Sequence, residues 1–201
     1  MRLAPIADLA GVPRENCGSI APAPSSGGSF LAYKLKCQGG GRTAYPSARD
    51  GTMDKFYFDD IAEDMTVEFG KFEMTQDEII RFAKAYDPQS FHTEPVPPPD
   101  SAFPKLIASG WNTAAATMRM FVENWILKCH VLPSPGLDEL RFVRPVFPGD
   151  TLRLRLSVIA KRKSATKRDR GIMNFRLETL NQNGEVVLTF KSIDFLKIRP
   201  A

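Results

Sequence analysis

A change in hydrophobic period partway along the chain restricts the fold more than any other feature. Residues 111 to 128 carry apolar side chains at helical spacing. From Leu152 apolar and polar residues alternate, and a second alternating segment includes Phe175 and Leu177. Strict alternation is typical of half-buried antiparallel strands. The sequence therefore predicts one long helix packed against a sheet. The apolar positions that define this helix are Ala114, Ala115, Met118, Phe121, Val122 and Trp125.

A second helix is predicted upstream of the long one. Thr75 and Glu78 form a capping box, and an apolar stripe from Ile79 to Tyr86 continues to about Asp87. Further strands are expected at residues 67–74 and 137–146. The dipeptide Asn183-Gly184 predicts a type I′ hairpin turn between the last two strands. The order of one strand, helices and four strands indicates an α+β fold, with a long central helix against a mostly antiparallel five-stranded sheet.

The first 52 residues differ in composition from the rest of the chain. They are rich in Gly, Ser, Pro and Ala and have no sustained period, which predicts a poorly ordered extension. One domain is then expected at residues 53–201. Two interpretations remain open for the first 52 residues. They form a true extension, or they lie upstream of the real start, with Met53 as an internal initiator. Either way, a chain that begins at Met53 is expected to fold.

Composition excludes several classes of function. The net charge of +4 comes without nucleic-acid-binding motifs, so a nucleic-acid partner is not expected. No apolar run of about 18 residues and no secretory signal is found, which favours the cytoplasm and no membrane contact. Cys17, Cys37 and Cys129 are odd in number and lack metal-ligand spacing. We expect free thiols and no metal.

The segment from Asp87 to Glu94 is the strongest candidate for chemistry. It places a carboxylate, Asp87, and an imidazole, His92, five residues apart at the end of a helix. The two groups could share a proton-transfer task, because the ordinary pKa of histidine lies near neutrality. On spacing alone a structural alternative remains open. Asp87 could simply end the helix, and His92 could be a surface or packing residue.

Two other segments could bind negative charge. Ser109 and Gly110 directly precede the long helix, where the free N–H groups and the helix dipole attract anions. The N–H of Gly110 could stabilise an oxyanion there, although Ser109 could equally be an ordinary N-cap. A basic cluster between two predicted strands could hold phosphates, or it could be a solvated loop. That cluster consists of Lys161, Arg162, Lys163, Lys167, Arg168 and Arg170.

Three motifs in order resemble those of one family. Asp87 and His92 keep the spacing of an Asp-x-Asn-Pro-x-His-x-Asp motif, and residues 106–110 resemble its apolar-Ala-His-Gly entry to a central helix. The third match is Leu140-Arg141-Phe142, Pro145-Val146 and Pro148-Gly149-Asp150-Thr151. Residues from about 54 to the end resemble the MaoC-like dehydratase family, which includes the (R)-specific enoyl-CoA hydratases.

The resemblance implies a hot-dog fold, in which a sheet wraps the long helix, and a homodimer with its sites near the subunit interface. It implies that Asp87 and His92 activate a water for addition to a 2-enoyl thioester, and that Gly110 donates its N–H to the thioester oxygen. Phe91, Ser109 and Trp111 are then expected to contact the substrate, an acyl-CoA or acyl-carrier-protein thioester of fatty acid metabolism. The basic cluster is expected at the phosphates of coenzyme A. No metal or other cofactor is implied.

The chain departs from the family motif around Asp87 and His92. Gln89 and Ser90 replace Asn-Pro, Glu94 replaces the later Asp, and Ser109 replaces the His before the helix glycine. Prolines between residues 95 and 99 replace a short helical segment. Supporting hydrogen bonds set the pKa and orientation of reacting groups, so these changes bear on activity. Two alternatives to a hydratase remain: a hot-dog acyl-CoA thioesterase, and a non-catalytic acyl-CoA-binding or partner subunit.

Overall fold

The computed structural model describes residues 55–200, and the N-terminal segment with Cys17 and Cys37 lies outside them. The sheet has five strands in the order β1-β3-β4-β5-β2, and every neighbouring pair is antiparallel. The predicted α+β fold is confirmed. No helix within residues 55–200 is long and apolar enough to cross a membrane. The elements are η1 (Phe58–Asp60), β1 (Thr66–Met74), α1 (Gln76–Tyr86), α2 (Ser90–Thr93), α3 (Gly110–Asn124), η2 (Ile126–Lys128), β2 (Val131–Phe142), β3 (Asp150–Lys163), β4 (Arg170–Leu180) and β5 (Val186–Lys197).

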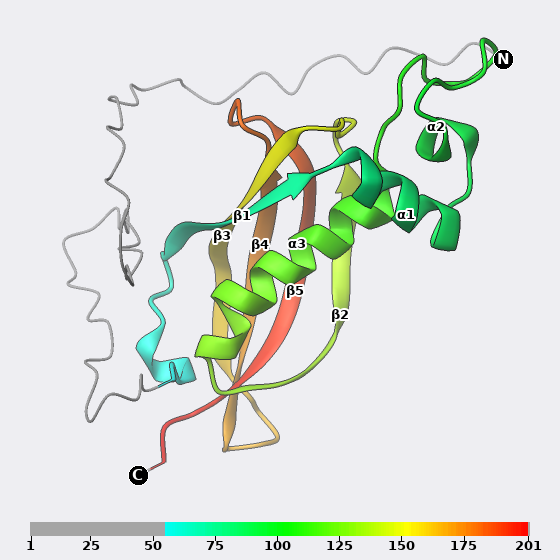
Figure 1. The fold of residues 1–201 in the computed structure, drawn as a ribbon. Helices are drawn as coiled ribbons and strands as arrows, with labels where there is room; N and C mark the ends of the chain where they lie inside the picture. Colours follow the sequence, from blue (N-terminus) through cyan, green and yellow to red (C-terminus); the bar gives the residue numbers. More distant parts are fainter. Residues whose placement is uncertain (1–54, 201) are drawn as a thin grey trace, which may run out of the picture. The chain divides into compact units, whose positions relative to one another are not determined.

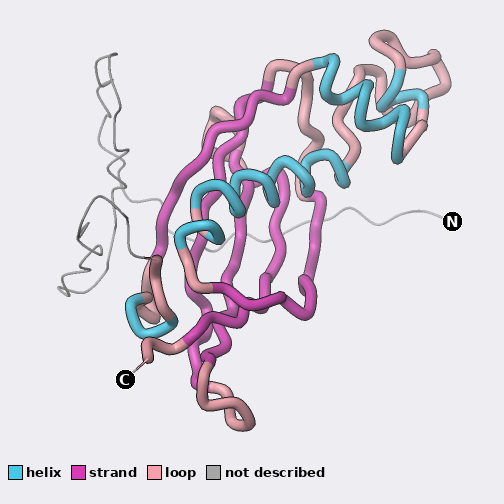
Figure 2. Tube along the Cα trace, turned by 60° about the horizontal axis from the view of Figure 1, so that its bottom comes forward, coloured by secondary structure: helices cyan, strands magenta, loops and turns pink. Residues whose placement is uncertain are grey.

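Helix α3 lies across one face of the sheet, and α1 and α2 lie at one end of it (Figures 1 and 2). The alternation found in the sequence places Leu152, Leu154 and Leu156 on the helix side, where all three are fully buried. Phe175 and Leu177 do the same on β4. Burial of such side chains contributes roughly 1.5–3 kcal/mol each. The hydrophobic core therefore lies between α3 and the inner face of the sheet.

The inward face of α3 differs from the predicted apolar stripe. Ala115 and Met118 are exposed, whereas Thr113 and Thr117 face the sheet and are buried. Thr117 Oγ1 donates to the carbonyl of Thr113 over 2.8 Å and lies 2.6 Å from Thr179 Oγ1 on β4. Because these hydroxyls are hydrogen-bonded inside the protein, their burial is tolerated. The helix also ends at Asn124, short of the predicted Lys128, and the 3-10 turn η2 follows it.

The β4–β5 turn lies at the predicted place but has another geometry. Gly184 has a φ of 80°, whereas the φ of Asn183 is not positive. A type I′ turn needs positive φ at both residues, so the prediction of that turn type was wrong. The reason is Asn181, whose side-chain Oδ1 accepts hydrogen bonds of 3.0 Å from the N–H groups of both Asn183 and Glu185. These bonds hold a longer turn in which only the glycine needs the left-handed region.

The bounds of strand β2 also differ from those predicted. It spans Val131–Phe142, beginning and ending earlier than the expected segment of residues 137–146. Its first half was not predicted because it contains Pro133 and Pro135, and proline normally interrupts a strand. At the edge of the sheet, where β2 lies, the missing N–H groups cost little.

A carboxyl group is buried near the opposite end of the fold from α1. Asp194 on β5 is 5% exposed, and its Oδ2 accepts a hydrogen bond of 2.6 Å from Ser192 Oγ. Burial raises the pKa of Asp194, and the Ser192 hydrogen bond only partly offsets this. Burial likewise raises the pKa of the nearby free thiol of Cys129 to about 12, with Asp194 adding to the shift. A thiol with that pKa is unreactive near neutrality.

The raised pKa of Asp194 predicts how stability depends on pH. The folded state favours the protonated carboxyl, so this stabilisation is complete below the ordinary pKa of 3.8 and is lost as pH rises through the folded-state pKa. Asp194→Asn keeps the shape and removes the charge. We expect the variant to gain stability relative to wild type as pH rises from 4 to 8. Urea unfolding at several pH values measures this, and a difference that is constant with pH would contradict it.

Candidate active site

Asp87 occupies the position where helix α1 ends. Proline at position 88 disfavours helical backbone at the residue before it, so the helix stops at Tyr86. Asp87 is the C-cap, and its N–H still donates to the carbonyl of Ala83 over 2.8 Å. The short helix α2 follows directly and carries His92. A proline-dependent stop and a one-turn helix thus bring the carboxylate and the imidazole to the same place.

His92 is held in one orientation and one neutral tautomer. Its side chain is buried, and Nδ1 lies 2.8 Å from the carbonyl oxygen of Ile107. Because a carbonyl oxygen can only accept, Nδ1 carries the hydrogen, and Nε2 of the neutral ring keeps its lone pair. The N–H of Ile107 in turn donates to the carbonyl of Phe91 over 3.0 Å. The backbone of the segment before α3 therefore holds the His92 ring on its Nδ1 side.

The structure brings Asp87 and His92 together as the spacing suggested. Asp87 Oδ2 lies 3.5 Å from His92 Nε2. Gln89 Nε2 donates to Asp87 Oδ1, and Ser109 Oγ donates to Asp87 Oδ2, each over 2.7 Å. Burial raises the pKa of Asp87, but the hydrogen bonds from Ser109 and Gln89 and the charge of His92 outweigh it and leave that pKa below its ordinary value. A carboxylate thus faces His92 Nε2.

A cavity of about 250 Å³ opens beside His92. Its lining includes His92, and it includes Ala108 and Gly110 on either side of Ser109. Gly110 is the first residue of α3, and N–H groups in a first helical turn have no partner within the helix. The cavity therefore combines the ring of His92 with the positive end of a helix. Its other lining residues are mostly apolar: Phe91, Phe103, Ile107, Thr113, Phe142, Val143, Arg144, Pro145, Val146 and Val187.

The three residues expected to contact the substrate occupy different environments. Phe91 lines the cavity, and its ring packs 5.4 Å from that of Phe103. Trp111 is 59% exposed and packs edge-on against Phe142, with ring centroids 5.9 Å apart. Ser109 is fully buried and binds Asp87 instead of facing open space. Phe91 thus faces the cavity, whereas Ser109 contacts Asp87.

The basic cluster is not near Asp87 within one chain. It lies on the β3–β4 hairpin, at the far end of the sheet from α1 and α2 (Figure 1). The 14 residues of β3 separate the two ends, a span of roughly 45 Å at about 3.3 Å per residue. Lys161 has a structural contact, because its Nζ donates to the carbonyl of Ile61 over 2.7 Å and lies 4.6 Å from the centre of the Phe58 ring. Arg162, Lys163, Lys167 and Arg168 are exposed.

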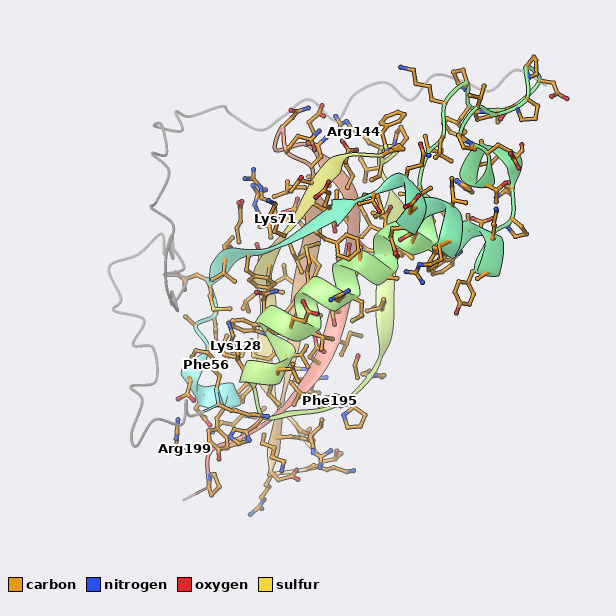
Figure 3. All side chains as sticks on the ribbon, in the orientation of Figure 1. Phe56, Lys71, Lys128, Arg144, Phe195 and Arg199 are labelled. Carbon is orange, nitrogen blue, oxygen red and sulfur yellow. The ribbon has the colours of Figure 1, made fainter. Side chains whose placement is uncertain are left out.

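Several residues of the site had no signal in the sequence. The carbonyl of Ile107 orients His92, yet any residue supplies a carbonyl. Phe142 and Arg144 reach the cavity from the end of β2, more than 30 positions after Gly110 in the chain. Figure 3 shows Arg144 at the opposite end of the sheet from Lys128 and Arg199. In the sequence, only the motif match over residues 140–151 indicated that the segment after β2 is related to the site.

Comparisons with known proteins identify the family. The family model described as "MaoC like domain" matches residues 60–176. A MaoC-like dehydratase structure from Rhodospirillum rubrum is 33% identical, covers 73% of this chain and 99% of its own, and superposes with a TM-score of 0.67. The protein YdeM of Bacillus subtilis is 28% identical over 110 residues, 55% of this chain and 77% of YdeM.

A named enzyme matches a shorter stretch. Mesaconyl-CoA hydratase of Cereibacter sphaeroides is 42% identical over 55 residues, which are 27% of this chain and 16% of that enzyme. The family model covers more than half of the chain, and the fold agrees with it. The chain belongs to the MaoC-like dehydratase family and has its hot-dog fold.

Proposed function

We propose that this protein is a hydratase/dehydratase that adds water to, or removes it from, a 2-enoyl/3-hydroxyacyl thioester of coenzyme A or acyl carrier protein. One observation carries the proposal. Asp87 Oδ2 lies 3.5 Å from His92 Nε2, and His92 lines a cavity together with Gly110, the first residue of α3. When the His92 ring is neutral, its Nε2 and the Asp87 oxygen are both acceptors and can share one water, which donates a hydrogen to each.

The chemistry follows from these positions. The water oxygen bonds to C3 of the enoyl group while the pair Asp87/His92 takes its proton. The electrons of the C2=C3 bond move toward the thioester oxygen, where the N–H of Gly110 and the dipole of α3 stabilise the enolate. The protonated pair then returns a proton to C2. Dehydration is the same path in reverse, and no group other than water and the thioester is consumed.

The discriminating experiment is a panel of 2-enoyl-CoA substrates that differ in chain length. Loss of the conjugated thioester absorbance without release of thiol supports hydration. Release of thiol at the same rate as loss of the thioester would indicate a thioesterase. Saturable binding of acyl-CoA with neither reaction would indicate a non-catalytic subunit. The matching 3-hydroxyacyl-CoA should be dehydrated to the same equilibrium mixture.

We also propose that two copies associate through the exposed face of α3 and the end of β2. Trp111, Met118 and Phe142 are 59%, 37% and 52% exposed, and Val143 next to Phe142 is 46% exposed. An apolar group of this kind is unusual on the surface of a monomer. Phe142 also lines the cavity, so a partner covering it would help to close the site. Strand β2 is a sheet edge, which a partner would protect.

Light scattering is expected to report about twice the chain mass of 22.4 kDa. Trp111→Glu should shift the protein to the monomer, because a charge would be buried without a partner. Ile159→Glu is the control: Ile159 is 42% exposed and lies on β3, which is neither α3 nor the end of β2. A monomeric wild type at micromolar concentration would overturn this interface, and so would equal dissociation of both variants.

A further inference from the structure

We propose that Ser109 is a positioning residue whose single hydroxyl joins the carboxylate of Asp87 to the start of helix α3. The inference rests on the proposed function and assigns Ser109 a role other than contact with substrate. The hydroxyl donates to Asp87 Oδ2 over 2.7 Å, and its oxygen accepts the N–H of Trp111 over 3.2 Å. One oxygen atom therefore connects the proton-transfer pair with the helix turn that holds Gly110.

The geometry makes this contact more than an ordinary helix cap. A capping serine needs only to accept hydrogen bonds from the first helical turn. Ser109 also donates, and it donates to the same oxygen of Asp87 that faces His92 Nε2 at 3.5 Å. The side chain is fully buried, so water cannot compete for this hydrogen bond. A hydrogen bond to a carboxylate is about twice as strong as one between neutral groups.

A second donor completes the support of Asp87. Gln89 Nε2 donates to Asp87 Oδ1 over 2.7 Å, so each carboxylate oxygen has a donor of its own. Gln89 is exposed, and water can replace its amide. Because no solvent reaches Ser109, its loss is expected to disturb the carboxylate more than the loss of Gln89. Both residues stand where the family motif has other side chains, and together they give this chain its own way of holding the carboxylate.

The kinetic test compares Ser109→Ala and Ser109→Gly with two controls. Hydrogen bonds that orient a functional group typically contribute about 10–100-fold to activity, so kcat should fall by that factor while KM stays within about two-fold. Ser109→Gly keeps a good N-cap residue, so it removes the donor with little effect on folding. Thr75→Ala removes the cap of α1, which accepts from Glu78 N and does not touch Asp87. Gln89→Ala removes the exposed donor.

A second readout does not depend on turnover. The titration of the Asp87 carboxyl carbon, followed by 13C NMR, is expected to move to higher pH in Ser109→Gly, and the acid limb of the activity profile should move with it. If wild type hydrates no substrate in the panel, the proposed function fails, yet this titration still tests the role of Ser109. An unchanged titration would overturn the role, as would a loss of kcat no larger than that of Thr75→Ala.

Discussion

Asp87→Asn, His92→Asn and the double variant are expected to lose hydration activity by similar factors, in the range of about 10²–10⁴. The effects should not multiply, because either substitution already disables a pair that acts on one water. Asn at position 92 is chosen for a structural reason. Its amide can still donate to the carbonyl of Ile107, as Nδ1 of His92 does over 2.8 Å, while the Nε2 acceptor is removed. Stopped assays with the best 2-enoyl-CoA measure all three rates.

The competing interpretation is that the pair is structural, and melting temperature separates the two. All variants are expected to melt within about 4 °C of wild type, a shift that corresponds to roughly 1 kcal/mol for a chain of this size. Asp77→Asn, an exposed carboxylate in the first turn of α1, is the control and should keep the wild-type rate. Folded variants with wild-type rates would place the chemistry elsewhere. Unfolded single variants would favour a packing role.

Gly110→Ala is expected to lower kcat/KM by about 10²-fold, the scale of loss that a misplacement of 1 Å can cause. A Cβ at this position would lie 2.7 Å from the ring of Phe142, so the ring must shift. Phe142 lines the cavity and packs against Trp111, and its displacement changes the space in which the thioester binds. Alanine favours helix more than glycine, so stability should change little.

A second variant locates the cause of that loss. Gly110→Ala/Phe142→Ala removes the clash, and Phe142→Ala alone reports the cost of losing the ring. Recovery of the double variant to the rate of Phe142→Ala would show that the shifted ring caused the loss. Failure to recover would place the new methyl group in the path of the substrate. A wild-type rate in Gly110→Ala would contradict the prediction, because it would show that a shift of the Phe142 ring has no effect on catalysis while alanine keeps the backbone N–H.

Local patterns determined much of the fold. Thr75 caps α1, with its hydroxyl accepting the N–H of Glu78, because that contact spans only three residues. The reciprocal half of the predicted capping box does not form, since the N–H of Thr75 donates to the carbonyl of Glu73 and Glu78 pairs with Arg81. The alternation from Leu152 onward predicted which side chains enter the core. The proline after Asp87 ends a helix through a clash between neighbouring residues. Each of these depends on atoms close in the chain, so each could be predicted from sequence.

Contacts between distant segments were decided only by the tertiary structure. Ser109 is 22 positions from Asp87, and nothing in its neighbourhood in the chain indicates that its hydroxyl binds that carboxylate. Thr117 faces the sheet because Thr179 on β4 lies opposite it, and without that partner the hydroxyl would favour the exposed face. Within one chain, the length of β3 separates the basic cluster from Asp87, a distance that the sequence did not indicate. Sequence determined the candidate pair Asp87/His92 and the layers, whereas the packing of α1, α2 and α3 determined which groups contact that pair, because hydrogen bonds depend on distance in space and not along the chain.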